Sequence, residues 1–164
     1  MAKPLQGRHS AEIDGDFVVF LIGARPSLRH PIRSIVDLGG RRGMRHMLTW
    51  LTEHPEKGLL GFEMGLPTIV QYWRSFEHLE AYARDHNRLH WPAWVDFNKK
   101  IGKSRGDVGI WHETYLIKPG QYEAVYSGMP PYGLGKAGKL VPASGLRDAA
   151  AGRVRATVSV DSAG

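Results

Sequence analysis

Eight histidines occur in this sequence of 164 residues, and a few of them could support chemistry. His86 and His90 are four residues apart in a stretch expected to be helical, which would turn both rings to one helix face. Two such imidazoles can share a metal ion, but a mononuclear site needs a third ligand, for which His112 and Glu113 are the candidates. Two polar residues at a helix start explain the same spacing, and we therefore expect no metal.

His112 and Glu113 occur within residues 108–117, where the sequence alternates as a strand would. The alternation places His112 on one face of the strand and Trp111, Glu113 and Tyr115 on the other. A His or Glu buried in an interior strand must be paired or hydrogen-bonded, so we expect at least one of the two to face a cavity or a dimer interface. A structural pairing and a catalytic role are equally compatible with this pattern.

The elements that would position these residues follow a regular order. Residues 17–22, 59–64, 68–73 and 108–117 have strand patterns, with turn chemistry at 65–67. Residues 31–54 and 75–101 have apolar residues at helical spacing, interrupted near residues 39–40 and at Pro92. The resulting β-α-β-β-α-β order predicts an α+β, ferredoxin-like fold, in which two helices cover one face of a four-stranded antiparallel sheet. The other face would be apolar and bare, which favours a homodimer of the dimeric α/β-barrel type.

We predict four regions along the chain. Residues 1–15 form an N-terminal extension and residues 16–120 the ferredoxin-like domain. Residues 121–142 are rich in glycine and proline and predict an extended arm that packs on its own domain or on a dimer partner. Residues 143–164 are small and polar, and we expect a flexible tail there.

Three segments carry a resemblance to a known family. Residues 71–82 (QYWRSFEHLEAY), His90 within LHWPAW, and residues 109–115 (GIWHETY) resemble the antibiotic-biosynthesis-type monooxygenase superfamily. Together with the arm segment YSGMPPYGL at 126–134, they are most similar to a branch that includes a fungal terpenoid-pathway monooxygenase. The resemblance covers residues 16–134 and implies a ferredoxin-like dimer with a pocket between the sheet and the helices.

A cofactor-free monooxygenase of secondary metabolism is the main function that the resemblance implies. An apolar or aromatic small molecule would bind in a pocket whose candidate substrate-binding residues are Trp73, Tyr82, Trp94, Trp111 and Tyr115. His90 and His112 are the candidate bases and Glu113 their orienting partner. The anion formed by proton removal can give an electron to dioxygen without a metal.

Two alternative functions stay open. Some superfamily members bind haem b, and here His90 or His112 would be the axial ligand, with Tyr82 where haem-degrading members carry a tryptophan. Those members also have an asparagine in the first strand, which residues 17–22 lack, so we expect aldoxime-dehydratase-like chemistry in preference to haem degradation. A non-catalytic dimeric binding domain is the other alternative.

Composition excludes several other classes of protein. The absence of cysteine excludes disulfides, thiolate metal sites and a cysteine nucleophile. The formal net charge is +6, but the basic residues are spread along the chain, so we expect no nucleic-acid partner. Neither a signal peptide nor an apolar run of roughly 20 residues occurs, which predicts a cytoplasmic protein without membrane contact.

Overall fold

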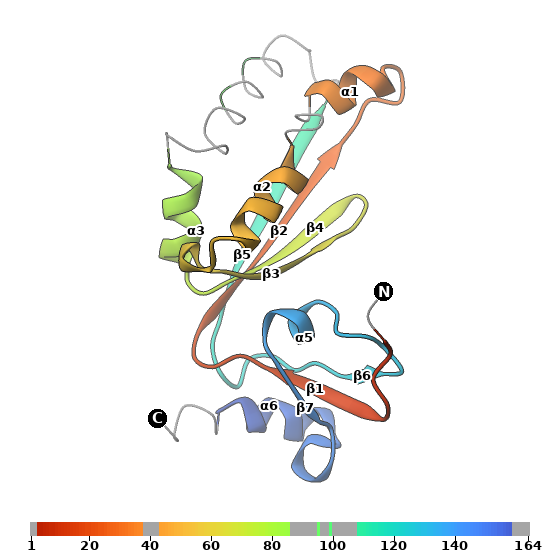
Figure 1. The fold of residues 1–164 in the computed structure, drawn as a ribbon, viewed down its shortest axis with the longest axis vertical. Helices are drawn as coiled ribbons and strands as arrows, with labels where there is room; N and C mark the ends of the chain where they lie inside the picture. The colour runs from red at the N-terminus through yellow and green to blue at the C-terminus, as the bar shows by residue number, and fades with distance from the viewer. Residues whose placement is uncertain (1–2, 38–42, 86–94, 96–98, 100–107, 159–164) are drawn as a thin grey trace.

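Two antiparallel sheets organise the chain in the computed structural model, which describes residues 3–37, 43–85, 95, 99 and 108–158 (Figure 1). The larger sheet contains β2 (Phe17–Arg25), β3 (Leu59–Met64), β4 (Thr68–Trp73) and β5 (Gly109–Ile117), in the order β3-β4-β2-β5. Between β2 and β3 lie α1 (Pro31–Asp37), α2 (Met44–Thr52) and the short 3-10 helix η2 (Pro55–Lys57), and α3 (Phe76–Ala83) follows β4. This arrangement confirms the predicted ferredoxin-like α+β fold.

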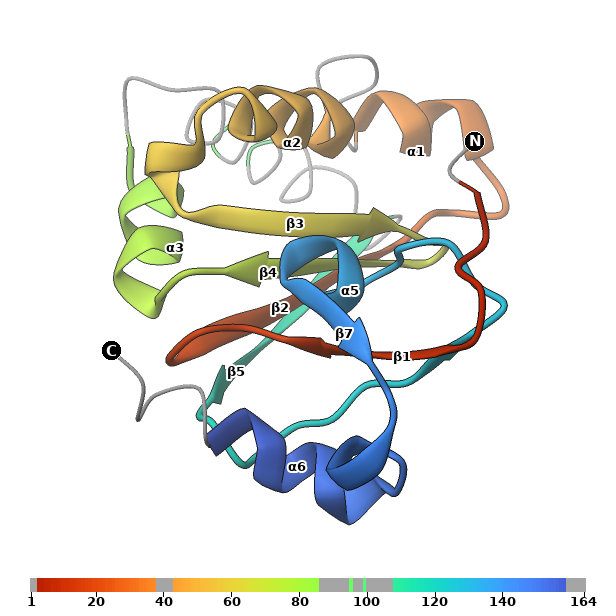
Figure 2. The same cartoon turned by 60° about the horizontal axis from the view of Figure 1, so that its bottom comes forward.

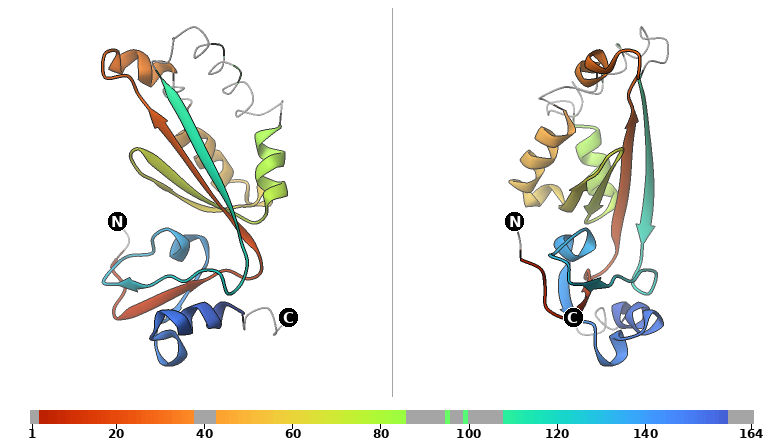
Figure 3. Two further views of the ribbon diagram at one scale, coloured as in Figure 1. Left: turned by 180° about the vertical axis from the view of Figure 1, so that it is seen from behind. Right: turned by 90° about the vertical axis from the view of Figure 1, so that its right-hand side faces the viewer.

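The core lies where α2 and α3 pack on one face of the larger sheet, as the right-hand view of Figure 3 shows. Met47, Leu48 and Leu51 recur at helical spacing on α2 and are buried against the sheet. The Ser75 hydroxyl caps α3 by accepting a hydrogen bond from the His78 backbone N–H. The buried cluster consists of Val18, Leu48, Leu51, Leu59, Trp73, Leu79 and Tyr82.

A smaller sheet joins the two ends of the described chain. β1 (Arg8–Glu12) lies between β6 (Tyr126–Ser127) and β7 (Lys139–Pro142), and α5 (Leu134–Ala137) precedes β7. The 3-10 helix η3 (Gly145–Arg147) and α6 (Ala150–Val158) follow β7 (Figure 2). The N-terminal extension is therefore part of a sheet, and the arm packs on its own chain.

The structure has η3 and α6 within residues 143–158, where the sequence predicted a flexible tail. Arg153 on α6 is buried and donates a hydrogen bond to Glu123 Oε2 at 2.7 Å. Arg147 donates to the buried Glu12 carboxylate on β1 at 2.6 Å. A Cβ at Gly152 would overlap the Leu146 carbonyl, so small residues here allow close packing. Ion pairs and small residues anchor this segment without the large apolar side chains that a sequence pattern detects.

None of the helices within the described ranges is long and apolar enough to cross a membrane.

Candidate functional site

Two of the predicted substrate-binding residues belong to the core. Trp73 is 1% exposed, and its indole Nε1 donates a hydrogen bond to Gln71 Oε1 at 3.0 Å. The Tyr82 ring packs against Trp73 with 5.8 Å between ring centroids. Burial raises the pKa of the Tyr82 hydroxyl to about 12. These two side chains fill the space between the sheet and the helices at this end, so they contribute to stability and do not line an open pocket.

Trp111 and Tyr115 lie on the opposite face of the sheet, together with Glu113. Their partners on β2 are Gly23, Val19 and Leu21, respectively. The Trp111 ring lies over Gly23, where a Cβ would come within 2.5 Å of the indole Nε1. The Tyr115 hydroxyl donates to Glu113 Oε2 at 2.6 Å, and this hydrogen bond raises the tyrosine pKa.

The predicted substrate-binding residues therefore do not form one pocket. Trp73 and Tyr82 are on the helix side, whereas Trp111 and Tyr115 are exposed on what we call the free face, the sheet face without α2 and α3. Trp94 and the candidate base His90 lie outside the described residues.

His112 projects to the helix side, as the alternation of the strand predicts. Its ring is 5.5 Å from the Phe20 ring, with 35° between the ring planes. His112 and Glu113 are both exposed in the single chain. Among the described residues β5 pairs with β2 alone, so it is an edge strand of the larger sheet and solvent can satisfy both side chains. The expectation that one of them faces a cavity or a dimer interface stays a prediction.

Burial on the helix side changes along the sheet. The residues packed beneath α2 and α3 are fully buried, whereas Phe20, Met44 and Ile69 are only partly buried. We call these three side chains, together with His112, the helix-side surface. It combines partly buried apolar side chains with one exposed imidazole that lies beside the Phe20 ring. An imidazole next to an apolar ring can accept a proton from a substrate that packs there. Phe20 was not among the predicted site residues. Its aromatic side chain within the predicted strand at residues 17–22 is the signal that could have identified it.

Within the described part of the chain, no three His, Asp or Glu side chains are grouped in a way that could hold a metal ion. His112 is the described residue that could act as an axial ligand to haem iron, because its imidazole is exposed on an apolar surface.

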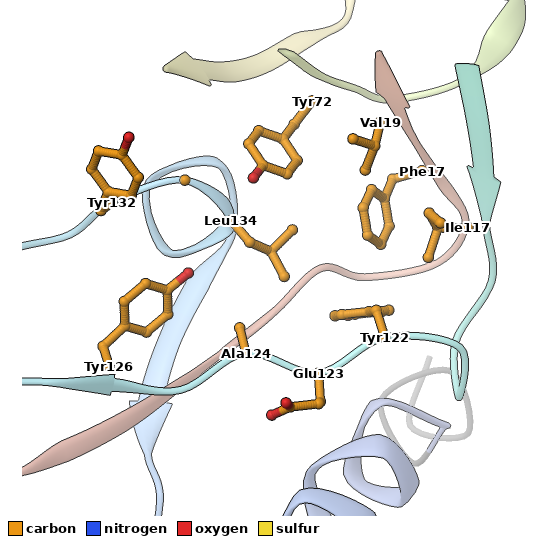
Figure 4. A pocket seen from close by; sticks show the side chains of 11 residues that line it. Phe17, Val19, Tyr72, Ile117, Tyr122, Glu123, Ala124, Tyr126, Tyr132 and Leu134 are labelled. Atoms are coloured by element: carbon orange, nitrogen blue, oxygen red, sulfur yellow. The ribbon is translucent and has the colours of Figure 1, made fainter. Parts of the chain in front are cut away.

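A cavity of about 320 Å³ lies on the free face, between the sheet and the arm (Figure 4). We call it the arm cavity. Phe17, Val19 and Ile117 form an apolar wall, Tyr72 stands next to Val19, and Tyr126 lies at the opposite side. The remaining lining residues are Tyr122, Glu123, Ala124, Tyr132, Gly133 and Leu134.

A backbone amide of the arm fixes one tyrosine hydroxyl of this cavity. Gly135 N–H donates to the Tyr126 oxygen at 2.8 Å. Burial, with added repulsion from Tyr126 and Glu63, raises the pKa of Tyr72 to about 12. Burial also raises the pKa of Tyr126, while the Gly135 amide acts in the opposite direction. Both hydroxyls are therefore neutral over the physiological pH range.

Comparison with known proteins gives two findings. Residues 17–134 match the family described as Monooxygenase af470-like. Monooxygenase af470 of Aspergillus fumigatus is 28% identical over 160 residues, an alignment that covers 83% of this chain and 56% of the relative. The chain thus spans a little over half the length of this curated relative. The matched residues include the whole four-stranded sheet and the arm up to the start of α5.

Proposed function

The chain belongs to the Monooxygenase af470-like family, and on that premise we propose that it is a monooxygenase of secondary metabolism. The substrate that we propose is a small apolar or aromatic molecule bound on the helix-side surface. His112 is the proposed base, and Phe20 the ring against which the substrate packs.

The observation that supports this proposal is the position of His112. Its imidazole is exposed, and it stands beside the Phe20 ring, which packs against the core cluster. An imidazole ring carries a nitrogen lone pair that can accept a proton. The apolar surroundings favour an uncharged aromatic substrate over a charged one.

The proposed reaction converts an activated methylene group into a carbonyl. His112 takes a proton from the methylene carbon, and the carbanion gives one electron to dioxygen. The two radicals combine to form a peroxide, whose O–O bond breaks as water leaves with the second hydrogen. One oxygen atom of dioxygen becomes the carbonyl oxygen and the other becomes water, so the four electrons come from the substrate carbon and no external reductant is consumed.

Haem chemistry is the alternative at the same residue. If haem binds, His112 is the described side chain that would hold its iron, and the group would supply oxygen or nitrogen chemistry at that iron. The His112 imidazole would then be a ligand, and it would have no free lone pair with which to remove a proton. A binding domain without catalysis is the remaining alternative.

Oxygen uptake tests these alternatives. The purified chain is mixed with a panel of aryl ketones and phenols that carry an acidic C–H or O–H group, and oxygen is followed with an electrode. We expect His112→Ala to lower the rate by about 100-fold or more, the usual contribution of a general base. His46→Ala is the matched control, because His46 is an exposed histidine on α2 and lies outside the helix-side surface.

The visible spectrum, recorded with and without added haemin, separates the two chemistries. If the original chain shows a Soret band with haemin and His112→Ala does not, the haem alternative is supported and the cofactor-free proposal is refuted. Equal rates for His112→Ala and His46→Ala in a colourless protein would refute His112 as the base.

A further inference from the structure

The arm cavity lies on the opposite face of the sheet from His112, so the proposed oxidation does not use it. Its floor is formed by residues of β2, β4 and β5, including Val19 and Tyr72, and its cover is formed by the arm. Figure 4 shows the apolar side chains of Phe17, Val19 and Ile117 at one end, Tyr126 toward the other end, and Tyr72 between them beside Val19. The cavity is thus divided into an apolar part and a hydrogen-bonding part.

The arm cavity has the volume of a small-molecule site and is open to solvent on one side. About 320 Å³ is at the lower end of the range for ligand pockets in proteins, roughly 300–1,000 Å³. Tyr132 lies at the rim with 50% of its surface exposed, which leaves a route for entry. The backbone of Gly133 passes so close to Tyr72 that a Cβ would come 3.1 Å from the hydroxyl oxygen, and Gly133 also has a positive φ of 55°. Glycine at this position brings the arm close to the tyrosine without filling the space beside it.

The polar end of the cavity donates hydrogen bonds. Tyr126 accepts the Gly135 amide through the phenol oxygen, so it keeps its own proton to donate. Tyr72 also lines this end, with its hydroxyl close to the arm backbone at Gly133, and its neutral phenol has a proton to donate. Tyr122 differs, because its hydroxyl accepts from Ile13 N–H and donates to Ile13 O and is already used for structure. The ligand group that matches two phenol donors is an oxygen with two lone pairs, such as a ketone.

Charge indicates that the ligand is neutral. The Glu63 carboxylate, next to the polar end, accepts from Gly133 N–H at 3.0 Å and from Lys136 Nζ at 3.3 Å. Glu123 in the lining is paired with Arg153 at 2.7 Å. Because both carboxylates already have cationic partners, the cavity offers no unpaired charge to an ionic ligand.

We propose that the arm cavity is a binding site for a small, neutral, mainly apolar molecule with one hydrogen-bond-accepting oxygen, which Tyr72 and Tyr126 hold through their hydroxyl protons. The hydrocarbon part of the ligand lies against Phe17, Val19 and Ile117. The oxygen lies at the tyrosine end, beside Leu134.

A pair of probes of equal shape tests the site. 1-Tetralone is a bicyclic aryl ketone, and tetralin is the same hydrocarbon without the carbonyl. Each is titrated into the full ¹⁵N-labelled chain, and the amide signals are followed by NMR. The Gly135 signal is a local reporter, because this amide donates to Tyr126. We expect 1-tetralone to shift it and to bind about fivefold to a hundredfold more tightly than tetralin, which is the effect of two neutral hydrogen bonds.

Variants that remove single hydroxyls identify the donors. Tyr72→Phe and Tyr126→Phe keep the rings, and we expect each to lower the affinity for 1-tetralone toward that for tetralin. Tyr115→Phe is the matched control, because this tyrosine lies on the same sheet face but outside the cavity. Two independent variants keep the test valid if one of them fails to fold.

The proposal is overturned if neither probe shifts the Gly135 signal up to its solubility limit, or if both bind equally well. It is also overturned if the shifts gather around His112 and disappear in His112→Ala, since the probe would then occupy the helix-side surface. The two proposals can fail separately. If 1-tetralone binds in the arm cavity and oxygen uptake is unchanged, the binding site is supported. The rate of oxygen uptake in His112→Ala tests only the proposed oxidation.

Discussion

Replacement of Arg153 by methionine tests how the C-terminal helix is attached. The Arg153 side chain is 6% exposed and makes three hydrogen bonds, to Glu123 Oε2 at 2.7 Å, Asp148 O at 2.8 Å and Arg147 O at 3.1 Å. Methionine keeps most of the apolar stem and removes the guanidinium, so the loss is mainly electrostatic.

The magnitude follows from these contacts. A hydrogen bond to a charged group contributes about 1.5–3 kcal/mol, and breaking a fully buried ion pair costs about 3–5 kcal/mol. The Glu123 side chain is 35% exposed and can be rehydrated, which lowers the cost. We expect Arg153→Met to lower the free energy of opening α6 by about 2–3 kcal/mol, within the range for loss of a partly buried ion pair.

Hydrogen exchange of the α6 amides is the assay, because the helix can detach without global unfolding. Arg155→Met is the matched control: Arg155 is exposed on the same helix, and we expect a change of less than about 0.5 kcal/mol. Adding Glu123→Gln to Arg153→Met should restore part of the stability, since it removes the unpaired charge. Equal exchange of α6 in Arg153→Met and Arg155→Met would refute the anchoring role of the ion pair.

Two further predictions concern the aromatic residues. Trp73→Phe should lower the free energy of unfolding by about 1.5–3 kcal/mol, because it opens a cavity and leaves Gln71 Oε1 without its donor. Trp111→Phe, at an exposed position, should lower it by less than about 1 kcal/mol. Urea denaturation measures both variants, and equal losses would contradict the assignment of Trp73 to the core. Stability should also fall as the pH rises from 10 toward 12, because Tyr72 and Tyr82 ionise near pH 10 in the unfolded chain and near pH 12 in the folded one, so the unfolded state binds fewer protons in this window. Denaturation at several pH values measures how steeply the free energy of unfolding falls with pH. The slope should be smaller in the Tyr72→Phe, Tyr82→Phe double variant. An equally steep slope in that variant would show that other groups cause the fall.

The strands of the larger sheet and their order along the chain could be predicted from the sequence because their signals are local, whereas β1, β6 and β7 were not predicted. β2 and β4 are short runs of β-branched and aromatic residues, β3 lies between Gly58 and Gly65, and β5 alternates. The position of β5 at the sheet edge could not be predicted in this way. Interior and edge strands share the same alternation, and their difference depends on which distant strand pairs with them.

The predicted pocket residues lie on two opposite faces of the sheet, and this too depends on the pairing of distant strands. The alternation of a strand shows which of its side chains share a face. It does not show whether a side chain of β4 and a side chain of β5 share a face, because that depends on how each strand pairs with β2. Trp73 pairs with Val18 and Trp111 is opposite Gly23, and these two β2 positions differ by an odd number of residues. The two tryptophans therefore project to opposite faces, although each strand had been identified correctly.

The arm cavity was beyond sequence reasoning for a related reason. Tyr126 and Tyr132 could be identified as anchors of the arm, but their partner Tyr72 lies more than fifty residues earlier, on β4. Nothing in the local sequence of the arm shows which of the two sheet faces it covers. The contact of Gly61 with Ala137, where a Cβ would be 3.1 Å from the helix α5 backbone, assigns the arm to the free face.

The arm also changes what a dimer of this chain can be. A homodimer stays a prediction, and a bare sheet would meet its partner over the whole face. Here the arm already covers Val19 and Tyr72, while Trp111 and Tyr115 are still 39% and 47% exposed. A twofold interface would therefore use the exposed side chains of β5, and Trp111 and Tyr115 of one subunit would meet the same residues of the other. Such an interface buries the aromatic residues at the sheet edge and leaves each arm cavity within its own subunit, so binding in the cavity does not require the dimer.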